Sequence, residues 1–179
     1  MPALRELVRR SVSERLAIDH AERRSIEICL AELDRLSDPF DEYGDLVHVT
    51  GSAIVAGPRG VVLLKHKRLG LWLQPGGHVD AGEAPWDGAL REAEEETGLT
   101  VSFADIDEVL GVPRLVHVDV HEGGRGHTHL DLRYLLHGGD ADPTPPEGES
   151  QEIGWFGWDD AIERASDDRL KSALTSLRP

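Results

Sequence analysis

The stretch GGHVDAGEAPWDGALREAEEETGL, residues 76–99, changes its pattern at Pro85. Apolar residues then recur at intervals of three and four as far as Thr97, which is typical of an amphipathic helix. Proline is favourable at the first helical position, and Gly98 supplies a C-terminal stop. The sequence therefore predicts a helix over residues 85–97. Its buried face would be formed by Trp86, Ala89, Leu90, Ala93 and Thr97.

A second face of this helix is acidic, because Glu92, Glu95 and Glu96 share the same three- and four-residue spacing. Like charges at such spacing destabilise a helix by a few tenths of a kcal/mol or more. A hard divalent cation, Mg²⁺ or Mn²⁺, would offset them, since these ions prefer carboxylate oxygen. Gly76 and Gly77 add backbone carbonyls that no side chain shields. The alternative is a solvated acidic face on an acidic protein.

The full pattern is more specific than the acidic face alone. It consists of Gly77, five residues, Glu83, seven residues and then REAEEETGL at 91–99. These 23 residues resemble the Nudix box, the signature of the Nudix hydrolase superfamily, at every specified position. The later segment GWFGWDDAIERA, residues 154–165, is also similar to the Nudix fold, whereas the first forty residues lie outside the resemblance.

This resemblance implies an α/β fold, namely the Nudix α/β/α sandwich with a mixed sheet, and an enzyme. The implied reaction is Mg²⁺- or Mn²⁺-dependent hydrolysis of a diphosphate bond in a nucleoside diphosphate derivative or related small organic pyrophosphate. Glu92, Glu95 and Glu96 would be metal-binding and catalytic, with the Gly76 carbonyl as a further ligand. Glu83 and Arg91 would be the supporting pair.

Two questions about this reaction stay open in the sequence. The general base is Glu92 or Glu95 inside the box, or one of three glutamates in a later loop. Those three are Glu147, Glu149 and Glu152. The rival function is a non-catalytic module that senses nucleotides, but such modules normally have eroded box carboxylates, and all are intact here.

The rest of the chain divides into an N-terminal helical extension, residues 1–40, and a Nudix domain, residues 41–179. Helical spacing continues to about residue 37, with Asp19 as a candidate cap, and stops at Asp38-Pro39. These helices could cap the sandwich, cover the cleft or form a homodimer interface. Later strands are expected over 46–56, 61–64, 71–73, 78–79, 115–121, 128–136 and 153–158, and helices from about 159 and 167.

The strands at 115–121 and 128–136 form a predicted hairpin whose polar residues share one face. Pairing His121 with His127 would place Asp119 opposite His129 and His117 opposite Asp131. The polar set could be a solvated outer face, which is the simplest expectation, a wall of the substrate cleft, or a second, imidazole-rich metal site. HTHLDLRYL, residues 127–135, is similar to a stretch in one bacterial Nudix subgroup, which favours the cleft. The hairpin candidates for substrate binding are His129, Asp131 and Arg133.

Three further residues are candidates for substrate binding. Lys65 and Arg68 belong to the one basic concentration, which could meet phosphate oxygens or could be a solvated turn. Trp72 could stack on a base or pack in the core.

The composition of the chain limits the kinds of molecule that it is expected to bind. A chain of 179 residues with 39% hydrophobic content can bury one sizeable core. The formal net charge of −15 would repel nucleic acid, so we expect a small nucleotide-type substrate. The single cysteine, Cys29, fits a reducing cytoplasm and a buried position in a helix. Neither a signal peptide nor a membrane span is expected.

Overall fold

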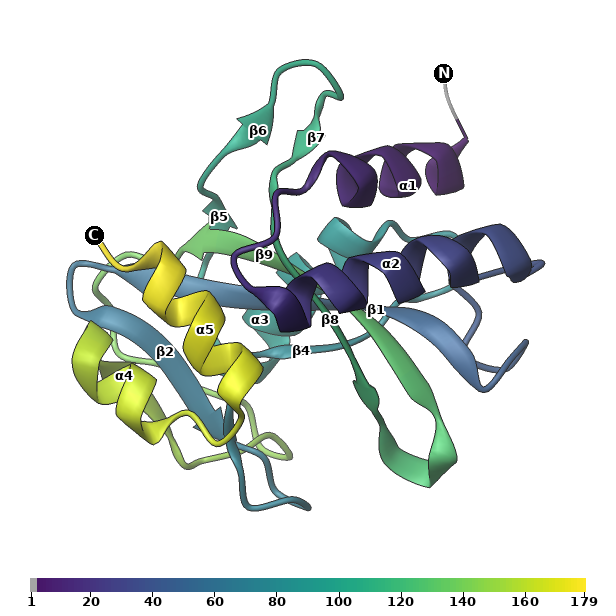
Figure 1. Ribbon diagram of the computed structural model, residues 1–179. Coiled ribbons are helices and arrows are strands. Elements are labelled where there is room, and N and C mark those ends of the chain that lie inside the picture. The colour runs from purple at the N-terminus through teal and green to yellow at the C-terminus, as the bar shows by residue number, and fades with distance from the viewer. Residues whose placement is uncertain (1–2) are drawn as a thin grey trace.

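The computed structural model describes residues 3–179, except for the side chain of Arg125. Its helices are α1 Leu4–Glu14, α2 His20–Arg35, α3 Pro85–Thr97, α4 Trp158–Arg164 and α5 Asp168–Leu177. Its strands are β1 Val47–Gly57, β2 Gly60–Lys65, β3 Trp72–Leu73, β4 Gly76–His78, β5 Ser102–Phe103, β6 Ile106–Asp107, β7 Val112–Pro113, β8 Leu115–Glu122, β9 Thr128–His137 and β10 Ile153–Phe156. Figure 1 shows their arrangement.

The centre of the fold is an eight-stranded mixed sheet. Its main order is β10-β2-β1-β9-β5, while β3 pairs with β2, β4 with β1 and β8 with β9. The β1–β9 pair is parallel and the other pairs of this sheet are antiparallel. β6 and β7 form a separate two-stranded sheet. A parallel pair needs a long crossover, and α3 lies within the segment that joins β1 to β9.

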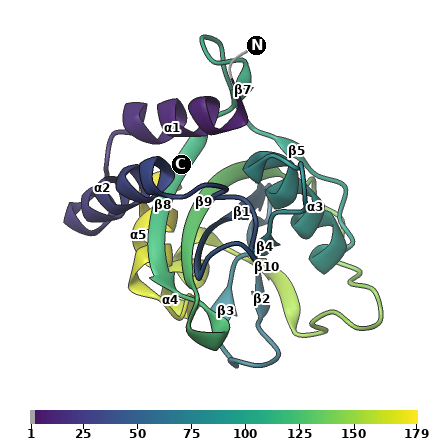
Figure 2. The ribbon, with the colours of Figure 1, turned by 90° about the vertical axis from the view of Figure 1, so that its right-hand side faces the viewer.

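Helices cover both faces of the sheet, so the predicted α/β/α sandwich is confirmed. On one face, Ala89 and Ala93 of α3 pack with apolar residues of β1 and β9. On the other face, α4 and α5 pack against Ile54, Val61 and Leu63. Figure 2 shows α3 on one side of β1 and β9, with α4 and α5 on the other. Strand alternation therefore gives each central strand two buried faces.

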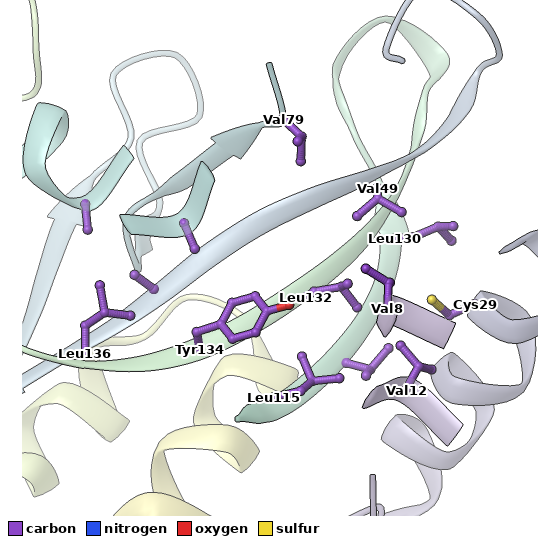
Figure 3. Close-up of a cluster of buried hydrophobic side chains, with 14 of the residues drawn as sticks. Val8, Val12, Cys29, Val49, Val79, Leu115, Leu130, Leu132, Tyr134 and Leu136 are labelled. Atoms are coloured by element: carbon purple, nitrogen blue, oxygen red, sulfur yellow. The ribbon is translucent and has the colours of Figure 1, made fainter. Parts of the chain in front are cut away.

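The N-terminal helices cap the sandwich at β8. Val8 and Val12 of α1 and Cys29 of α2 are fully buried and lie beside Leu130 and Leu132 in the main core (Figure 3). Asp19 caps α2 as predicted, because its side chain accepts a hydrogen bond from the Glu22 backbone N–H. Within the described chain, no helix is both long enough and apolar enough to cross a membrane.

Two sequence-based expectations about strands need correction. In the β8–β9 hairpin, His121 pairs with His129, Asp119 with Asp131 and His117 with Arg133, so the predicted register was wrong by two residues. The reason is a short 3-10 turn, Gly124–Gly126, closed by a 2.7 Å bond from the Gly123 N–H to the His127 carbonyl, which leaves His127 outside the ladder. An even shift keeps every side chain on its predicted face.

The second correction concerns β4. The segment Gly76–His78 pairs with Thr50, Gly51 and Ser52 of β1, whereas the sequence predicted a strand over residues 78–79. A pair of glycines often indicates a turn, but in this protein Gly76 and Gly77 allow the backbone of β4 to lie close to β1. A Cβ on Gly76 would lie 2.8 Å from the Gly51 carbonyl oxygen.

Candidate active site

Helix α3 is placed by features that its sequence predicts. It begins at Pro85, and Gly98 caps it with a left-handed φ of 67°. The helix lies very close to β1, because a Cβ on Gly51 would be 2.2 Å from the Pro85 carbonyl oxygen. This contact fixes where the acidic face of α3 points, and only glycine at position 51 permits it.

Arg91 organises the carboxylates on α3 and on the preceding loop. Its Nε and Nη2 each lie 3.0 Å from Glu83, and Nη2 also donates to the His78 carbonyl at 3.0 Å. Its Nη1 donates to Glu92 at 2.8 Å and to Glu95 at 3.2 Å. Burial opposes ionisation of Glu83, but the hydrogen bonds from Arg91 and from the Asp80 N–H, together with the charge of Arg91, outweigh it and lower the pKa of Glu83. One guanidinium thus holds the loop to the helix.

Glu92 and Glu96 lie deeper in the site than Glu95, whose side chain is 59% exposed. The Gly76 backbone N–H donates to Glu96 at 3.0 Å. Burial raises the pKa of Glu96 to about 7, and the charges of Glu92, Glu149 and Glu95 add to the effect. Burial also raises the pKa of Glu92. Both pKa directions mark carboxylates that a cation would stabilise.

The three box glutamates are less closely gathered than the helix spacing suggests. Among the described residues, they do not form a group whose ligand atoms all lie within 4.8 Å of one another. Glu92 and Glu95 both accept hydrogen bonds from Arg91 Nη1, whereas Glu96 accepts one from the Gly76 backbone N–H. The negative charge of Glu92 and Glu95 is therefore offset partly by the guanidinium of Arg91.

The residues nevertheless fit a hard divalent cation. Carboxylate and carbonyl oxygens are the ligands that Mg²⁺ and Mn²⁺ prefer. A Cβ on Gly77 would lie 2.6 Å from the Glu92 carboxyl group, so the missing side chain leaves room for that carboxylate. The charge of Glu149, on the loop before β10, contributes to the raised pKa of both Glu92 and Glu96.

A cavity of about 420 Å³ begins beside Glu96 and runs across the sheet to the β8–β9 hairpin. One part of its wall is apolar, formed by Leu64, Leu69, Leu71 and Leu73. The rest is polar and comes from β1, β4, β8, β9 and the start of α5. Those polar lining residues include Thr50, Ser52, His78, Asp119, His121, His129, Asp131, Arg133, Asp167 and Arg169.

The hairpin face is the floor of this cavity, so the expectation of a solvated outer face was wrong. Asp119 and Asp131 are each 1% exposed and Arg133 is 2% exposed. Arg133 donates to Asp131 at 3.0 Å and to Asp119 at 3.1 Å. Thr50 and Ser52 donate to the other Asp131 oxygen at 3.1 and 2.6 Å. The sheet and α5 together cover these residues, which a hairpin viewed alone could not reveal.

The other substrate candidates separate into two groups. Arg68 lines the cavity, and a Cβ on Gly124 at the hairpin tip would lie 2.5 Å from its Nη2. Lys65 pairs instead with Glu152 at 3.0 Å and is not among the cavity-lining residues. Trp72 packs edge-on against Phe156 with ring centroids 5.3 Å apart, in the core under α4. The structure therefore brings Arg68, but neither Lys65 nor Trp72, to the cavity.

The polar residues of β1 were not predicted from the sequence as part of the site. His48, Thr50 and Ser52 are buried and face the cavity side of the sheet, opposite Val49 and Ala53. Their alternation along residues 46–56 was a usable signal, because period-two polar positions in an otherwise apolar strand indicate a second, functional face.

Comparisons with known proteins agree with this geometry. A family model described as "NUDIX domain" matches residues 47–175. An RNA pyrophosphohydrolase of Erythrobacter litoralis is 40% identical over 60 residues, which are 34% of this chain and 35% of that protein. A probable DHNTP pyrophosphohydrolase of Lactococcus lactis is 34% identical over 112 residues, which are 62% of this chain and 63% of that protein. The chain thus spans about one third of the length of the first relative and less than two thirds of the length of the second.

Among solved structures, a NUDIX family hydrolase from Clostridium perfringens superimposes with a TM-score of 0.63 at 25% identity. The match covers 73% of this chain and 98% of that one. The family match spans most of the chain and contains the box helix, the sheet and the cavity floor. The chain therefore belongs to the Nudix hydrolase family.

Proposed function

We propose that this protein hydrolyses a diphosphate bond in a nucleoside diphosphate derivative or related small organic pyrophosphate, using Mg²⁺ or Mn²⁺. The observation that carries the proposal is the lining of the cavity, which includes Glu96 and Gly76 together with Arg68. A metal ion and a guanidinium can both neutralise the negative charge of a diphosphate, and this lining supplies metal-binding groups and a guanidinium.

The box residues would hold the metal through the carboxylates of Glu92, Glu95 and Glu96 and the Gly76 carbonyl. When bound, the ion would offset charge on the diphosphate and lower the pKa of an attacking water. Arg91 holds Glu83 of the preceding loop and the His78 carbonyl at the end of β4 against α3. Glu83 and Arg91 are positioning residues.

Glu149 is the strongest loop candidate for the general base. It is half-buried, and its charge acts on both Glu92 and Glu96, whereas Glu152 is exposed and paired with Lys65. Glu147 is exposed. Glu92 and Glu95 remain the candidates inside the box, although both accept hydrogen bonds from Arg91, which weakens them as bases.

A small substrate suits the site better than a polymer. The cavity of about 420 Å³ lies in the range of small-molecule sites. The net charge of −15 opposes binding of a nucleic acid strand. The curated relatives are named for RNA and for DHNTP, so their names by themselves do not select one class. We also place the protein in the cytoplasm, which suits its single, buried cysteine.

The test is a hydrolysis panel with and without Mg²⁺ or Mn²⁺. It would include nucleoside triphosphates, nucleoside diphosphate sugars, dinucleoside polyphosphates and a 5′-triphosphorylated oligonucleotide. We expect metal-dependent turnover of at least one small compound and a loss of about 100-fold or more in Glu96→Gln and Glu92→Gln. Glu94→Gln is the matched control, because Glu94 lies on the same helix with its side chain exposed.

Two results would overturn the proposal. Tight nucleotide binding without turnover of any compound would identify a sensing module. Preferential cleavage of the oligonucleotide would contradict the assignment of a small substrate.

A further inference from the structure

Four histidines meet beside the cavity, and none of them belongs to α3. They are His48 on β1, His78 at the end of β4, His127 just before β9 and His129 on β9. One potential ligand atom from each lies within 4.8 Å of every other. The centroid of the His48 ring is 5.1 Å from each of the other three ring centroids.

Strand register accounts for this meeting. His48 and His129 are directly paired across the parallel β1–β9 ladder. His78 pairs with Thr50, two residues further along β1, and His127 precedes His129 by two residues. All these offsets are even, so the four side chains project from one face of the sheet. Three of the four histidines are therefore placed by adjacent strands, and His127 lies at the end of the turn that leads into β9.

The hydrogen bonds of two rings select which nitrogen is free. The Nδ1 of His48 lies 3.3 Å from the Asp45 carbonyl oxygen. The Nδ1 of His78 lies 3.1 Å from a Glu42 carboxylate oxygen. In both residues the Nε2 atom is buried and has no hydrogen-bond partner among the residues that the structure describes, and His48 is fully buried. A histidine that donates from one nitrogen to a carbonyl or carboxylate presents a lone pair on the other, as metal-binding histidines do.

Two of the four rings, His48 and His129, also favour the neutral form. Burial lowers the pKa of His48, and the neighbouring charges of His78 and His127 lower it further. Burial lowers the pKa of His129 to about 4, with contributions from His121, His78 and His48. Neutral imidazole is the form that binds a metal ion. Buried nitrogens without partners are otherwise costly, because each loses its hydrogen bonds to water.

We propose that His48, His78, His127 and His129 form a binding site for one divalent transition-metal ion of the zinc class. Imidazole suits Zn²⁺, Co²⁺, Ni²⁺ and Cu²⁺, whereas the oxygen ligands on α3 suit Mg²⁺ and Mn²⁺, so the two sites differ in chemistry. Zinc–nitrogen bonds of about 2.0–2.1 Å place tetrahedral ligand atoms roughly 3.3 Å apart, which side-chain adjustments can reach from the observed spacing.

A metal ion in this site would join β4, β1 and β9 at one point. His78 and His129 also line the cavity, so the ion would lie at its wall. This inference does not depend on the proposed hydrolase activity. It predicts a second metal, with its own selectivity, in the same protein.

The experiment uses the full chain purified without a histidine tag, stripped with a chelator and titrated with Co²⁺ and Zn²⁺. We expect one equivalent of Co²⁺ to give the visible absorption of a tetrahedral nitrogen site, to be displaced by Zn²⁺, and to persist in excess Mg²⁺. His127→Ala and His78→Ala should weaken Co²⁺ binding by more than about 100-fold, and Glu42→Gln by about 10-fold through the outer hydrogen bond.

Controls separate this site from the acidic one and from misfolding. His137→Ala, at the exposed far end of β9, should bind Co²⁺ like the unaltered protein. Glu96→Gln should also retain the Co²⁺ spectrum. Each variant should keep the circular dichroism of the unaltered protein, and His127 is only half-buried, which makes its replacement tolerable. Loss of Co²⁺ binding in Glu96→Gln, or equal binding by His127→Ala and His137→Ala, would overturn the proposal.

Discussion

Gly77 illustrates how a missing side chain shapes the acidic end of the cavity. A Cβ at this position would lie 2.6 Å from the carboxyl group of Glu92, the flexible end of a side chain. The structure can therefore accept alanine by moving that carboxylate. We expect Gly77→Ala to cost less than about 1 kcal/mol of unfolding free energy, within the range of ordinary substitutions, yet to lower hydrolytic activity at least about 10-fold.

The measurements are urea unfolding and turnover of the best substrate from the panel. Gly154→Ala is the matched control, because a Cβ there meets nothing closer than 3.8 Å. Unchanged activity in Gly77→Ala would mean that the position of Glu92 does not matter for the reaction.

Arg133 is a buried charge whose partners are also buried. It contacts Asp119 and Asp131, so its guanidinium is already balanced by protein carboxylates. Arg133→Met would leave those carboxylates without their partner, and we expect a loss of about 3–5 kcal/mol in unfolding free energy. Arg68→Met, on the cavity rim, should change stability by less than about 0.5 kcal/mol and should weaken substrate binding instead.

Denaturant unfolding and substrate KM distinguish the two arginines. If Arg133→Met were as stable as the unaltered protein, its network would not hold the cavity floor. If Arg68→Met bound substrate normally, the guanidinium end of the proposed site would lie elsewhere.

At the scale of elements, α2 protects the free edge of β8. Within residues 3–179, strand β8 pairs only with β9, so its outer backbone N–H groups need other acceptors. The Val118 N–H donates to Glu22 at 3.1 Å, and the Val120 N–H donates to Ser25 at 3.2 Å. Glu22 also accepts from Arg15 and from the Ile18 N–H. A helix side chain thus takes the place of a further strand.

We expect Glu22→Ala to lower the free energy of unfolding by about 3 kcal/mol or more. The substitution leaves two backbone donors unsatisfied and Arg15 unpaired in a buried setting. Glu27→Ala, on the exposed face of the same helix, should have an effect below about 0.5 kcal/mol. Equal effects in urea titrations of the two variants would show that the edge of β8 does not depend on Glu22.

Helix ends and caps, which depend on neighbouring residues in the sequence, were predictable. The pairing of strands with one another was not. Helix α3 begins and ends where Pro85 and Gly98 indicate, and Asp19 and Asp167 cap α2 and α5. The hairpin register depended instead on a 3-10 turn in a glycine-rich loop, which composition does not specify. Loop geometry sets register, so the partner of each hairpin residue was predicted wrongly although its face was predicted correctly.

At the scale of the whole molecule, the N-terminal helices and the sheet share one core. Val8, Val12, Cys29 and Leu33 are buried in the same cluster as apolar residues of β1, α3 and β9. We therefore expect the two parts to unfold together. All four tryptophans lie between positions 72 and 158, so tryptophan fluorescence reports the sheet and its helices, while far-ultraviolet circular dichroism also reports α1 and α2.

The urea transitions seen by the two probes should coincide, as a single cooperative unit requires. An earlier transition in circular dichroism alone would identify residues 1–40 as an independent unit. The boundary at residue 40 stays a prediction until that comparison is made, as does a homodimer formed through the same helices.

The sequence by itself determined the family, the acidic helix, most strands and the sidedness of their residues. Those features depend on local periodicity, capping and a motif of fixed spacing, which a linear chain displays directly. Only the tertiary structure decided that Arg91 gathers the box carboxylates, that the hairpin face is a cavity floor, and that four histidines meet. Each of these results depends on which strands become neighbours and in what register, because side chains 81 residues apart in the chain, Thr50 and Asp131, touch only once β1 and β9 pair.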